Sequence, residues 1–399
     1  MLERIFCGKG ERIPPLRIAI IVERFAPWGG GVEKVAWQVA HELVRVGEDV
    51  TVLTRNVDPD FEKSTTTSPR PRVQRLRVPS QWQPLRVVAF SRASAGLIRR
   101  NEFDVVHSFS RTRIQDLFRA GGGSHSDYLR RSYSKRGALL RRFSPRHRVL
   151  LSVEAHVFGD PTQRIQCASR LVADELVANQ GVSPERILLL PNAVDASRYG
   201  TPTVLEAGRL LRAELDEAAE QIWLFPASGW RRKGLRTLLE AMARIRDPGL
   251  RLWIAGRDDP RPWLKISRRL GLSDRVRFLG LRDDLEAIFG AVDGMVLPTR
   301  YDAFANVTLE AAASGLPIIT TSANGASEWL GSAICRLENA DDPVALAGAI
   351  RSFTSPERRR SFGARAREKA LDLDWARHVS ALREEYHRIV DARSARSIR

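Results

Sequence analysis

Short apolar runs alternate with longer amphipathic stretches along most of the chain. In the first half the apolar runs predict strands, at residues 17–22, 50–54, 72–78 and 104–109. Between them, segments 32–47 and 85–100 repeat apolar residues every three or four positions, as helices with one buried side do. Strands that alternate with helices favour a parallel sheet with helices on both faces.

A second alternation of the same kind follows residue 195. Its predicted strands lie at 222–227, 251–256, 275–280, 294–298 and 317–321. Its predicted helices lie at 234–245, 262–271, 283–291 and 306–315, and the tail from Pro343 is helical, ending in a long helix from Trp375 to Val390. The sequence therefore predicts two α/β units divided near 191–200. We expect a ligand site in the cleft between them, because doubly wound sheets bind ligands at the carboxyl ends of their strands.

The segment from Pro298 to Pro317, PTRYDAFANVTLEAAASGLP, contains the most informative candidate residues. Its helix begins near Asn306, and a helix N-terminus presents unpaired N–H groups and a positive dipole end that suit a diphosphate. Glu310, one turn into the helix, can accept hydrogen bonds from two hydroxyls, as a ribose requires. Asp302, on the loop, can hold hydroxyls of a sugar. A structural alternative stays open, in which Asn306 caps the helix and Glu310 is a solvated charge.

Two further segments have the composition of phosphate-binding loops. SGWRRKGLRTLLEA (228–241) places two arginines and a lysine before a helix, where cations are electrostatically unfavourable unless an anion binds there. Guanidinium and ammonium groups together can neutralise a diphosphate without a metal ion. PWGGGVEKV (27–35) puts glycines between a strand and a helix, which lets the backbone approach a phosphate or a sugar closely. Any tight turn also uses glycine.

The spacing D-x7-E from Asp302 to Glu310, with LEAAASGLP around it, resembles the E-x7-E signature of the family-4 retaining glycosyltransferases. The resemblance implies that Glu310 binds the donor ribose and that Asp302 contacts the transferred sugar. WRRKG is similar to an R-K-G element of the family, which implies that Arg232 and Lys233 bind the donor phosphates. These four are the predicted catalytic residues. Donor contacts are also implied at the start of the helix, by Ala305, Asn306, Val307 and Thr308.

The resemblance also supplies candidates on the acceptor side. A similar glycine pair follows the first strand of the family, which implies that Gly30 and Gly31 lie at the site, with Glu33 beside them. Many members have a histidine in the element that contains His107, although a lone histidine at a strand end is otherwise structural. RIQDLFRAGGGSHSDYLRR (113–131) is similar to the lipopolysaccharide core glucosyltransferase I branch, which adds glucose from UDP-glucose to an inner-core heptose. In that comparison Asp116 falls beside the acceptor, or else caps a helix.

The implied architecture is the α/β GT-B fold, with two Rossmann-like doubly wound domains that face an interdomain cleft. Residues 15–192 would bind the acceptor and 193–372 the nucleotide-sugar donor, while a C-terminal helix within 373–399 packs back on the first domain. The implied reaction is a retaining hexosyl transfer in which the leaving phosphate takes the acceptor proton. We expect no metal and no cofactor besides the donor UDP-sugar, because no Asp-x-Asp motif is placed to hold a metal and the cations can carry the leaving-group charge.

The chain is strongly basic. Its 399 residues include 64 Lys and Arg against 47 Asp and Glu, a formal net charge of +17, which favours polyanionic partners: nucleic acid, an anionic membrane or phosphorylated small molecules. The densest basic stretch, 130–148, interleaves cations with Leu139, Leu140 and Phe143 and fits a segment lying on an anionic leaflet. A similar region of the branch named above docks to the inner membrane. A solvated helix face is the alternative, and no recognisable motif supports a nucleic acid partner.

Two features that the sequence lacks, a membrane span and closely spaced cysteines, indicate where in the cell the protein works. No apolar stretch approaches the ~18 residues of a membrane span, and the cysteines Cys7, Cys167 and Cys335 are far apart, as in reduced cytosolic proteins. We therefore expect a cytoplasmic enzyme, peripheral on the inner face of the cytoplasmic membrane, that uses a nucleotide-sugar donor and a lipid-linked saccharide acceptor. The rivals are a transferase for another glycan, a UDP-sugar 2-epimerase and a non-catalytic polyanion- or membrane-binding protein.

Overall fold

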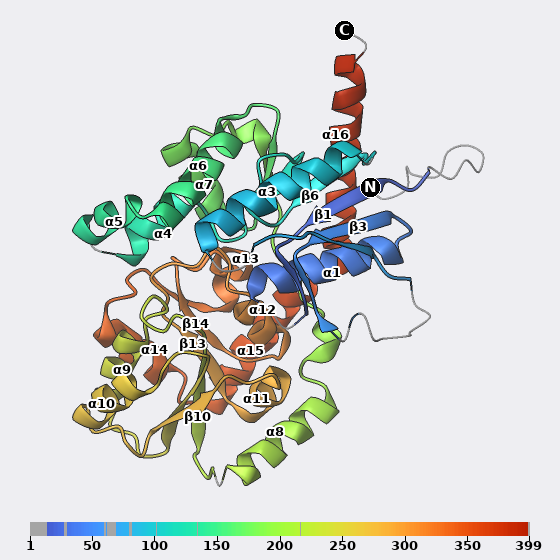
Figure 1. The fold of residues 1–399 in the computed structure, drawn as a ribbon. Coiled ribbons are helices and arrows are strands. Elements are labelled where there is room, and N and C mark those ends of the chain that lie inside the picture. Colours follow the sequence, from blue (N-terminus) through green and yellow to red (C-terminus); the bar gives the residue numbers. More distant parts are fainter. Residues whose placement is uncertain are drawn as a thin grey trace.

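The protein is described here from a computed structural model, for residues 14–27, 30–59, 61, 69–79, 82–100, 102–133, 135–215 and 217–397. Residues 28 and 29 of the predicted glycine-rich turn lie outside these ranges. The chain forms two α/β halves, each built on a parallel sheet, and its last helix returns to the first half (Figure 1). Among the described residues, no helix is both long and apolar enough to cross a bilayer.

A parallel sheet with the strand order β5-β3-β1-β6-β7-β8-β9 forms the centre of the first half. These strands are β1 (Arg17–Ile21), β3 (Asp49–Thr54), β5 (Arg72–Arg75), β6 (Val105–Ser108), β7 (Leu117–Arg119), β8 (Arg164–Cys167) and β9 (Ile187–Leu189), and a separate small sheet pairs β2 (Arg24–Phe25) with β4 (Asn56–Val57). The order steps outward in both directions from β1, which is the doubly wound pattern.

Helices cover both faces of this sheet. They are α1 (Gly31–Arg45), α3 (Gln83–Arg100), α4 (His125–Ser132), α5 (Lys135–Arg142), α6 (Pro145–Gly159), α7 (Arg170–Gln180) and the 3-10 turn η1 (Pro184–Arg186). Ile20 of β1 belongs to the buried cluster under α1, whereas its neighbour Ile21 belongs to the cluster under α3. Because successive side chains of β1 are buried on opposite faces, its sequence is a continuous apolar run rather than an alternating one.

The second half repeats this plan around a sheet with the order β12-β11-β10-β13-β14-β15. Its strands are β10 (Gln221–Pro226), β11 (Leu250–Ala255), β12 (Val276–Gly280), β13 (Gly294–Leu297), β14 (Ile318–Thr321) and β15 (Cys335–Leu337). Its helices are η2 (Ala196–Arg198), α8 (Pro202–Glu214), α9 (Leu235–Ala243), α10 (Arg261–Arg269), α11 (Leu285–Ala291), α12 (Asn306–Ala313), α13 (Ser327–Leu330), η3 (Gly331–Ala333), α14 (Pro343–Ser352) and α15 (Pro356–Leu371).

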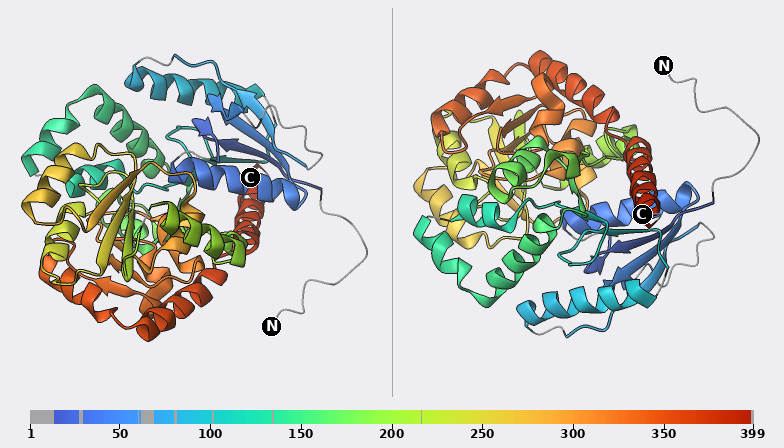
Figure 2. Two further views of the ribbon diagram at one scale, coloured as in Figure 1. Left: turned by 90° about the horizontal axis from the view of Figure 1, so that it is seen from below. Right: turned by 90° about the horizontal axis from the view of Figure 1, so that it is seen from above.

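The last helix, α16 (Trp375–Ser397), packs on the first half of the protein. Leu382 and Tyr386 belong to the same buried cluster as the side chains of α1 and β1, and both views of Figure 2 show α16 beside α1. Glu385 is fully buried and pairs with Arg164 of β8 at 2.5 Å. The predicted fold class, two doubly wound domains with a returning C-terminal helix, is confirmed.

The chain passes between the halves twice, and the two crossings lie side by side. The first follows β9 and the second precedes α16. The backbone N–H of Val194 donates to the carbonyl of Leu373 at 2.8 Å, and His378 Nδ1 lies 2.7 Å from the carbonyl oxygen of Pro191. Two chain segments joined in this way restrict how the halves can move, since neither crossing can shift alone.

Candidate active site

The loop between β10 and α9 contains the basic motif, and two features fix its shape. The carboxylate of Asp258 accepts hydrogen bonds from the N–H groups of Gly229 and Trp230, at 2.7 and 3.1 Å. Gly234 has φ +83°, and a Cβ at this position would overlap the carbonyl oxygen of Pro298. The basic loop can therefore approach the loop after β13 only because residue 234 is glycine.

Arg232 and Lys233 converge on Asp302, as expected for three residues that were predicted to bind one donor. Lys233 Nζ donates to Asp302 Oδ2, and Arg232 Nη1 lies 3.6 Å from the same oxygen. Lys233 is 7% exposed, and its burial, followed by the charge of Arg232, lowers the pKa of its ammonium group well below the usual range. One carboxylate therefore faces two basic side chains, and an anion bound beside them would favour the charged form of Lys233.

Backbone contacts hold Asp302 in position on the loop after β13. Its N–H donates to the carbonyl of Ala323 at 2.9 Å, and its own carbonyl accepts from Gly325 at 2.9 Å. Its Oδ1 accepts from the N–H of Phe304 at 3.0 Å, which leaves Oδ2 for the cations. The carboxylate is therefore oriented before any ligand binds.

The start of α12 has backbone N–H groups available for an anion. Asn324 accepts from the N–H of Ala305 at 3.2 Å and donates to Thr308 Oγ1 at 2.9 Å, so these two positions already have structural partners. No side chain caps the helix, and within the described ranges the N–H groups of Asn306 and Val307 make no hydrogen bond. The alternative in which Asn306 caps the helix is wrong, because Asn306 is the first helical residue.

Two contacts bring the first half of the protein to this helix. Lys34 of α1 pairs with Glu310 at 2.5 Å, and Glu310 is only 5% exposed, so it is not a solvated charge. A Cβ on Gly31 would lie 3.3 Å from Asn306 Nδ2. Gly30 and Glu33 lie at the same end of α1, with the Glu33 carboxylate turned toward Gly30. The N-termini of α1 and α12 therefore meet at the junction of the halves (Figure 1).

Behind this junction lies a buried arginine that the sequence analysis missed. Arg119, at the end of β7, donates to Asn192 Oδ1 at 2.5 Å, and Asn192 donates to Asn306 Oδ1 at 2.6 Å. Burial lowers the pKa of Arg119 to about 10, and no carboxylate in the described part of the chain pairs with it. This relay fixes the first residue of α12 from the opposite half.

Lys34 was also missed, although a signal for it exists in the sequence. It is a cation in the first turn of a helix, directly after a glycine-rich turn. That is the same electrostatically unfavourable placement that singled out the basic motif at 228–241. The N-termini of α1 and α9 therefore have the same sequence signal.

The structure does not bring two of the acceptor-side candidates to this junction. His107 is fully buried, and its Nδ1 lies 2.8 Å from the hydroxyl of Tyr386 in α16, while its ring packs against Phe109. Asp116 precedes β7 and therefore lies at the amino edge of the sheet, opposite the site. It accepts from the N–H of Val106 at 2.8 Å and pairs with Arg393. Among the described residues, no group of three or more His, Cys, Asp or Glu could hold a metal ion.

We expect Gly234→Ala to lower the free energy of unfolding by roughly 3 kcal/mol, because it combines left-handed backbone strain with overlap at Pro298. The matched control is Gly271→Ala, which has φ +70° but no atom within 4 Å of the added Cβ. Backbone strain alone should cost that variant about 1 kcal/mol. Urea unfolding of both variants measures the difference, and equal losses would contradict the role of the close approach.

Two family models match the chain, one on each half. Residues 29–198 match the model described as Glycosyltransferase Family 4, and residues 220–355 match the model described as Glycosyl transferases group 1. The lipopolysaccharide glucosyltransferase WaaG of Escherichia coli K12 is 23% identical over 327 residues, which are 80% of this chain and 83% of that protein. A D-inositol 3-phosphate glycosyltransferase of Geodermatophilus obscurus is 28% identical over 93% of this chain and 87% of its own.

Solved structures show the same fold. The crystal structure of WaaG, a glycosyltransferase involved in lipopolysaccharide biosynthesis, matches with a TM-score of 0.78 and 20% identity, over 93% of this chain and 99% of that one. Anabaena HepE in complex with UDP and glucose matches with a TM-score of 0.70 and 16% identity, over 93% and 99%. These similarities confirm the GT-B architecture. With both halves matched by its models, the chain belongs to the family-4 (group 1) glycosyltransferases.

Proposed function

We propose that this enzyme transfers glucose from UDP-glucose to a lipid-linked saccharide, the inner core of lipopolysaccharide, with retention at the anomeric carbon. The arrangement of Arg232, Lys233, Asp302 and Glu310 around the free N–H groups of α12 is the observation that supports it most. The choice of sugar and acceptor is supported by the name of the E. coli relative, a lipopolysaccharide glucosyltransferase, and by the UDP and glucose bound to HepE.

Each group at the junction has a proposed part in donor binding. The N–H groups of Asn306 and Val307 and the cations of Arg232 and Lys233 hold the diphosphate. Glu310 accepts the two ribose hydroxyls, and its present partner Lys34 then turns its ammonium toward the phosphates. Asp302 holds hydroxyls of the glucose. Its carboxylate is one methylene shorter than the family's glutamate, which places the sugar nearer to the loop.

The proposed reaction breaks the bond between the anomeric carbon and the phosphate oxygen while the acceptor hydroxyl attacks from the same face. The leaving phosphate oxygen takes the proton of that hydroxyl, so the proposal assigns no side chain as general base. Negative charge grows on the UDP as the bond breaks, and the buried cations stabilise it most in the transition state. The products are UDP and the glucosylated acceptor.

A donor and acceptor screen tests the proposal. Purified enzyme is incubated with radiolabelled UDP-glucose, UDP-N-acetylglucosamine or GDP-mannose, with heptose-bearing lipopolysaccharide core, with D-inositol 3-phosphate, or with no acceptor. We expect label on the core, and only from UDP-glucose. Label on inositol phosphate alone would contradict the acceptor, and an epimer formed from a UDP-sugar without acceptor would contradict transfer.

We also propose that the basic segment 130–148 holds the enzyme on the inner face of the cytoplasmic membrane. This segment covers the end of α4, all of α5 and the start of α6. Leu140 and Phe143 are 72% and 71% exposed, and the segment surrounds them with arginines. Apolar side chains among cations suit a surface that partly enters an anionic leaflet.

The double variant Leu140→Ser and Phe143→Ser should bind phosphatidylglycerol vesicles about tenfold more weakly, because it removes the apolar insertion and leaves the charge. Cosedimentation with vesicles measures the change. Leu210→Ser on α8 is the matched control, since Leu210 is 63% exposed in the other half. If the double variant sediments like the unmodified protein, the segment does not anchor the enzyme.

A further inference from the structure

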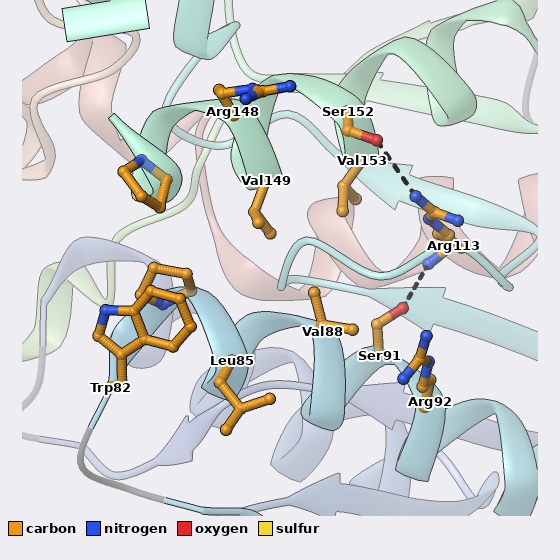
Figure 3. Close-up of a pocket in the computed structure, with 12 residues that line it drawn as sticks. Trp82, Leu85, Val88, Ser91, Arg92, Arg113, Arg148, Val149, Ser152 and Val153 are labelled. Atoms are coloured by element: carbon orange, nitrogen blue, oxygen red, sulfur yellow. Dashed lines mark hydrogen bonds between the residues drawn. The ribbon is translucent and has the colours of Figure 1, made fainter. Parts of the chain in front are cut away.

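A cavity of 670 Å³ lies between α3 and α6, on the face of the first sheet away from α1. Val88 of α3 and Val149 and Val153 of α6 line its middle, and Trp82 and Leu85 line one end (Figure 3). Trp82 is 58% exposed and Leu85 47% exposed, which is unusual for large apolar side chains. The two helices therefore enclose an apolar channel instead of closing on each other.

The other end of the cavity is cationic. Arg113 ties the two helices together there, because its backbone N–H donates to Ser91 Oγ of α3 and its Nη2 donates to Ser152 Oγ of α6, both at 3.2 Å (Figure 3). Arg92 lies at the same end, and Arg148 is on the rim. None of the lining residues is acidic, and within the described ranges none of the three arginines pairs with a carboxylate. The guanidinium groups of Arg92 and Arg113 at this end are therefore available to an anion.

The chemistry of the walls selects the ligand. A sugar or a nucleotide needs hydrogen-bonding groups along its length, but the middle of the cavity offers valines, and the oxygens of Ser91 and Ser152, at one end, already accept hydrogen bonds from Arg113. A free anion would need the arginines but not the apolar channel. A molecule with an apolar chain and an anionic head uses both, and the volume is in the usual range for small-molecule sites.

The position of the cavity indicates where such a molecule comes from. Pro145 lines the cavity, and two residues before it Phe143 is exposed together with Leu139 and Leu140. The chain therefore runs directly from the proposed membrane-binding surface into the wall of the cavity. The N-terminal end of α6 therefore joins the cavity to the proposed membrane surface.

We propose that the α3–α6 cavity binds one acyl chain of an anionic phospholipid, with the lipid phosphate at Arg92 and Arg113. The chain lies along Val88, Val149 and Val153 toward Trp82. The inference rests on the proposed membrane association for its choice of a lipid, but it does not depend on glucosyl transfer. A bound lipid would hold α3 and α6 together and fix the enzyme on the leaflet more specifically than surface charge does.

The test uses short-chain phosphatidylglycerol below its critical micelle concentration, so that no bilayer is present and surface docking cannot contribute. Binding to the full chain is measured by calorimetry. Val149→Trp, which fills the channel, should weaken binding about tenfold. Arg92→Gln, an exposed change that leaves the core intact, should weaken it about threefold. Arg100→Gln in the last turn of α3 is the matched control and should bind as the unmodified protein does.

Two other ligands and one other readout make the outcomes decisive. Short-chain phosphatidylcholine and glycerol phosphate should both bind much more weakly than phosphatidylglycerol. If glycerol phosphate binds as tightly as phosphatidylglycerol, the cavity is an anion site that takes no lipid chain. If phosphatidylcholine binds as tightly, the arginines have no role. Either result overturns the proposal, and so does unchanged phosphatidylglycerol binding by both Val149→Trp and Arg92→Gln. UDP binding by the same variants should be unchanged, and its absence in the unmodified protein would overturn the proposed function instead.

Discussion

Glu310→Ala should lower the turnover of UDP-glucose by a factor of roughly 10² to 10⁴, because the proposed donor site gives Glu310 two charge-assisted hydrogen bonds to the ribose, at about 1.5–3 kcal/mol each. It also leaves Lys34, at 2.5 Å from the carboxylate, without its partner across the junction. The loss should therefore appear both in the affinity for UDP and in the turnover number. Labelled-glucose transfer and calorimetry with UDP measure the two effects.

The controls for this variant separate chemistry from folding. Glu310→Gln keeps the shape and one hydrogen-bond acceptor, so it should recover part of the UDP affinity. Glu240→Ala removes an exposed carboxylate of the same half, whose partner Arg236 lies at 2.9 Å, and should leave turnover unchanged. Thermal unfolding shows whether the buried change destabilises the protein. Native turnover in folded Glu310→Ala would refute the assignment of the donor site.

Lys233→Met should reduce the turnover number about a thousandfold while changing the affinity for UDP-glucose much less. In the proposed donor site the buried ammonium group lies beside the leaving phosphate, so it should contribute more to the transition state than to the bound donor. Methionine replaces the apolar stem of the side chain without its charge. Asp302 then keeps only Arg232, at 3.6 Å, which should also lower the melting temperature slightly.

The neighbouring Arg231 provides the matched control for Lys233→Met. It belongs to the same basic motif but is exposed, and its carbonyl accepts a hydrogen bond from Arg300 at 3.0 Å that a side-chain change leaves in place. Arg231→Met should retain nearly full activity. Equal damage in both variants would mean that the motif acts by general electrostatics. In that case Lys233 would have no specific contact with the phosphates.

Local patterns were enough to predict many of the long elements and the donor motifs, although the helices α6, α7 and α8 were not predicted. All six residues of β10 are buried, five of the six residues of β11 are buried, and α9 has a clear apolar side; the predicted and observed bounds of these elements differ by at most two residues. β7, β8, β9 and β15 have three or four residues each, too few to show a period, and the sequence analysis did not predict them. The predicted strand 72–78 ends at Arg75, and the last helix continues past Val390 to Ser397.

The contacts of the two missed residues, Lys34 and Arg119, could not be predicted for one physical reason. Lys34 and Glu310 are 276 positions apart in the chain, and the relay from Arg119 to Asn306 crosses from one half to the other. No local spacing contains such contacts, so they appear only when the halves are docked. His107 and Asp116 lie away from the junction for a different reason, since the pattern of apolar residues did not show which face or edge of the sheet each side chain occupies.

The side-by-side crossings make the second half, the proposed donor half, an insertion within the first half. The Val194–Leu373 and His378–Pro191 contacts mark the two seams of this insertion. A chimera that exchanges donor specificity with a relative must therefore be cut at both seams and must keep α16 with its original partner sheet. A single cut near residue 193 would leave α1 without the helix that covers it, and such a hybrid should be insoluble however well its new donor half folds.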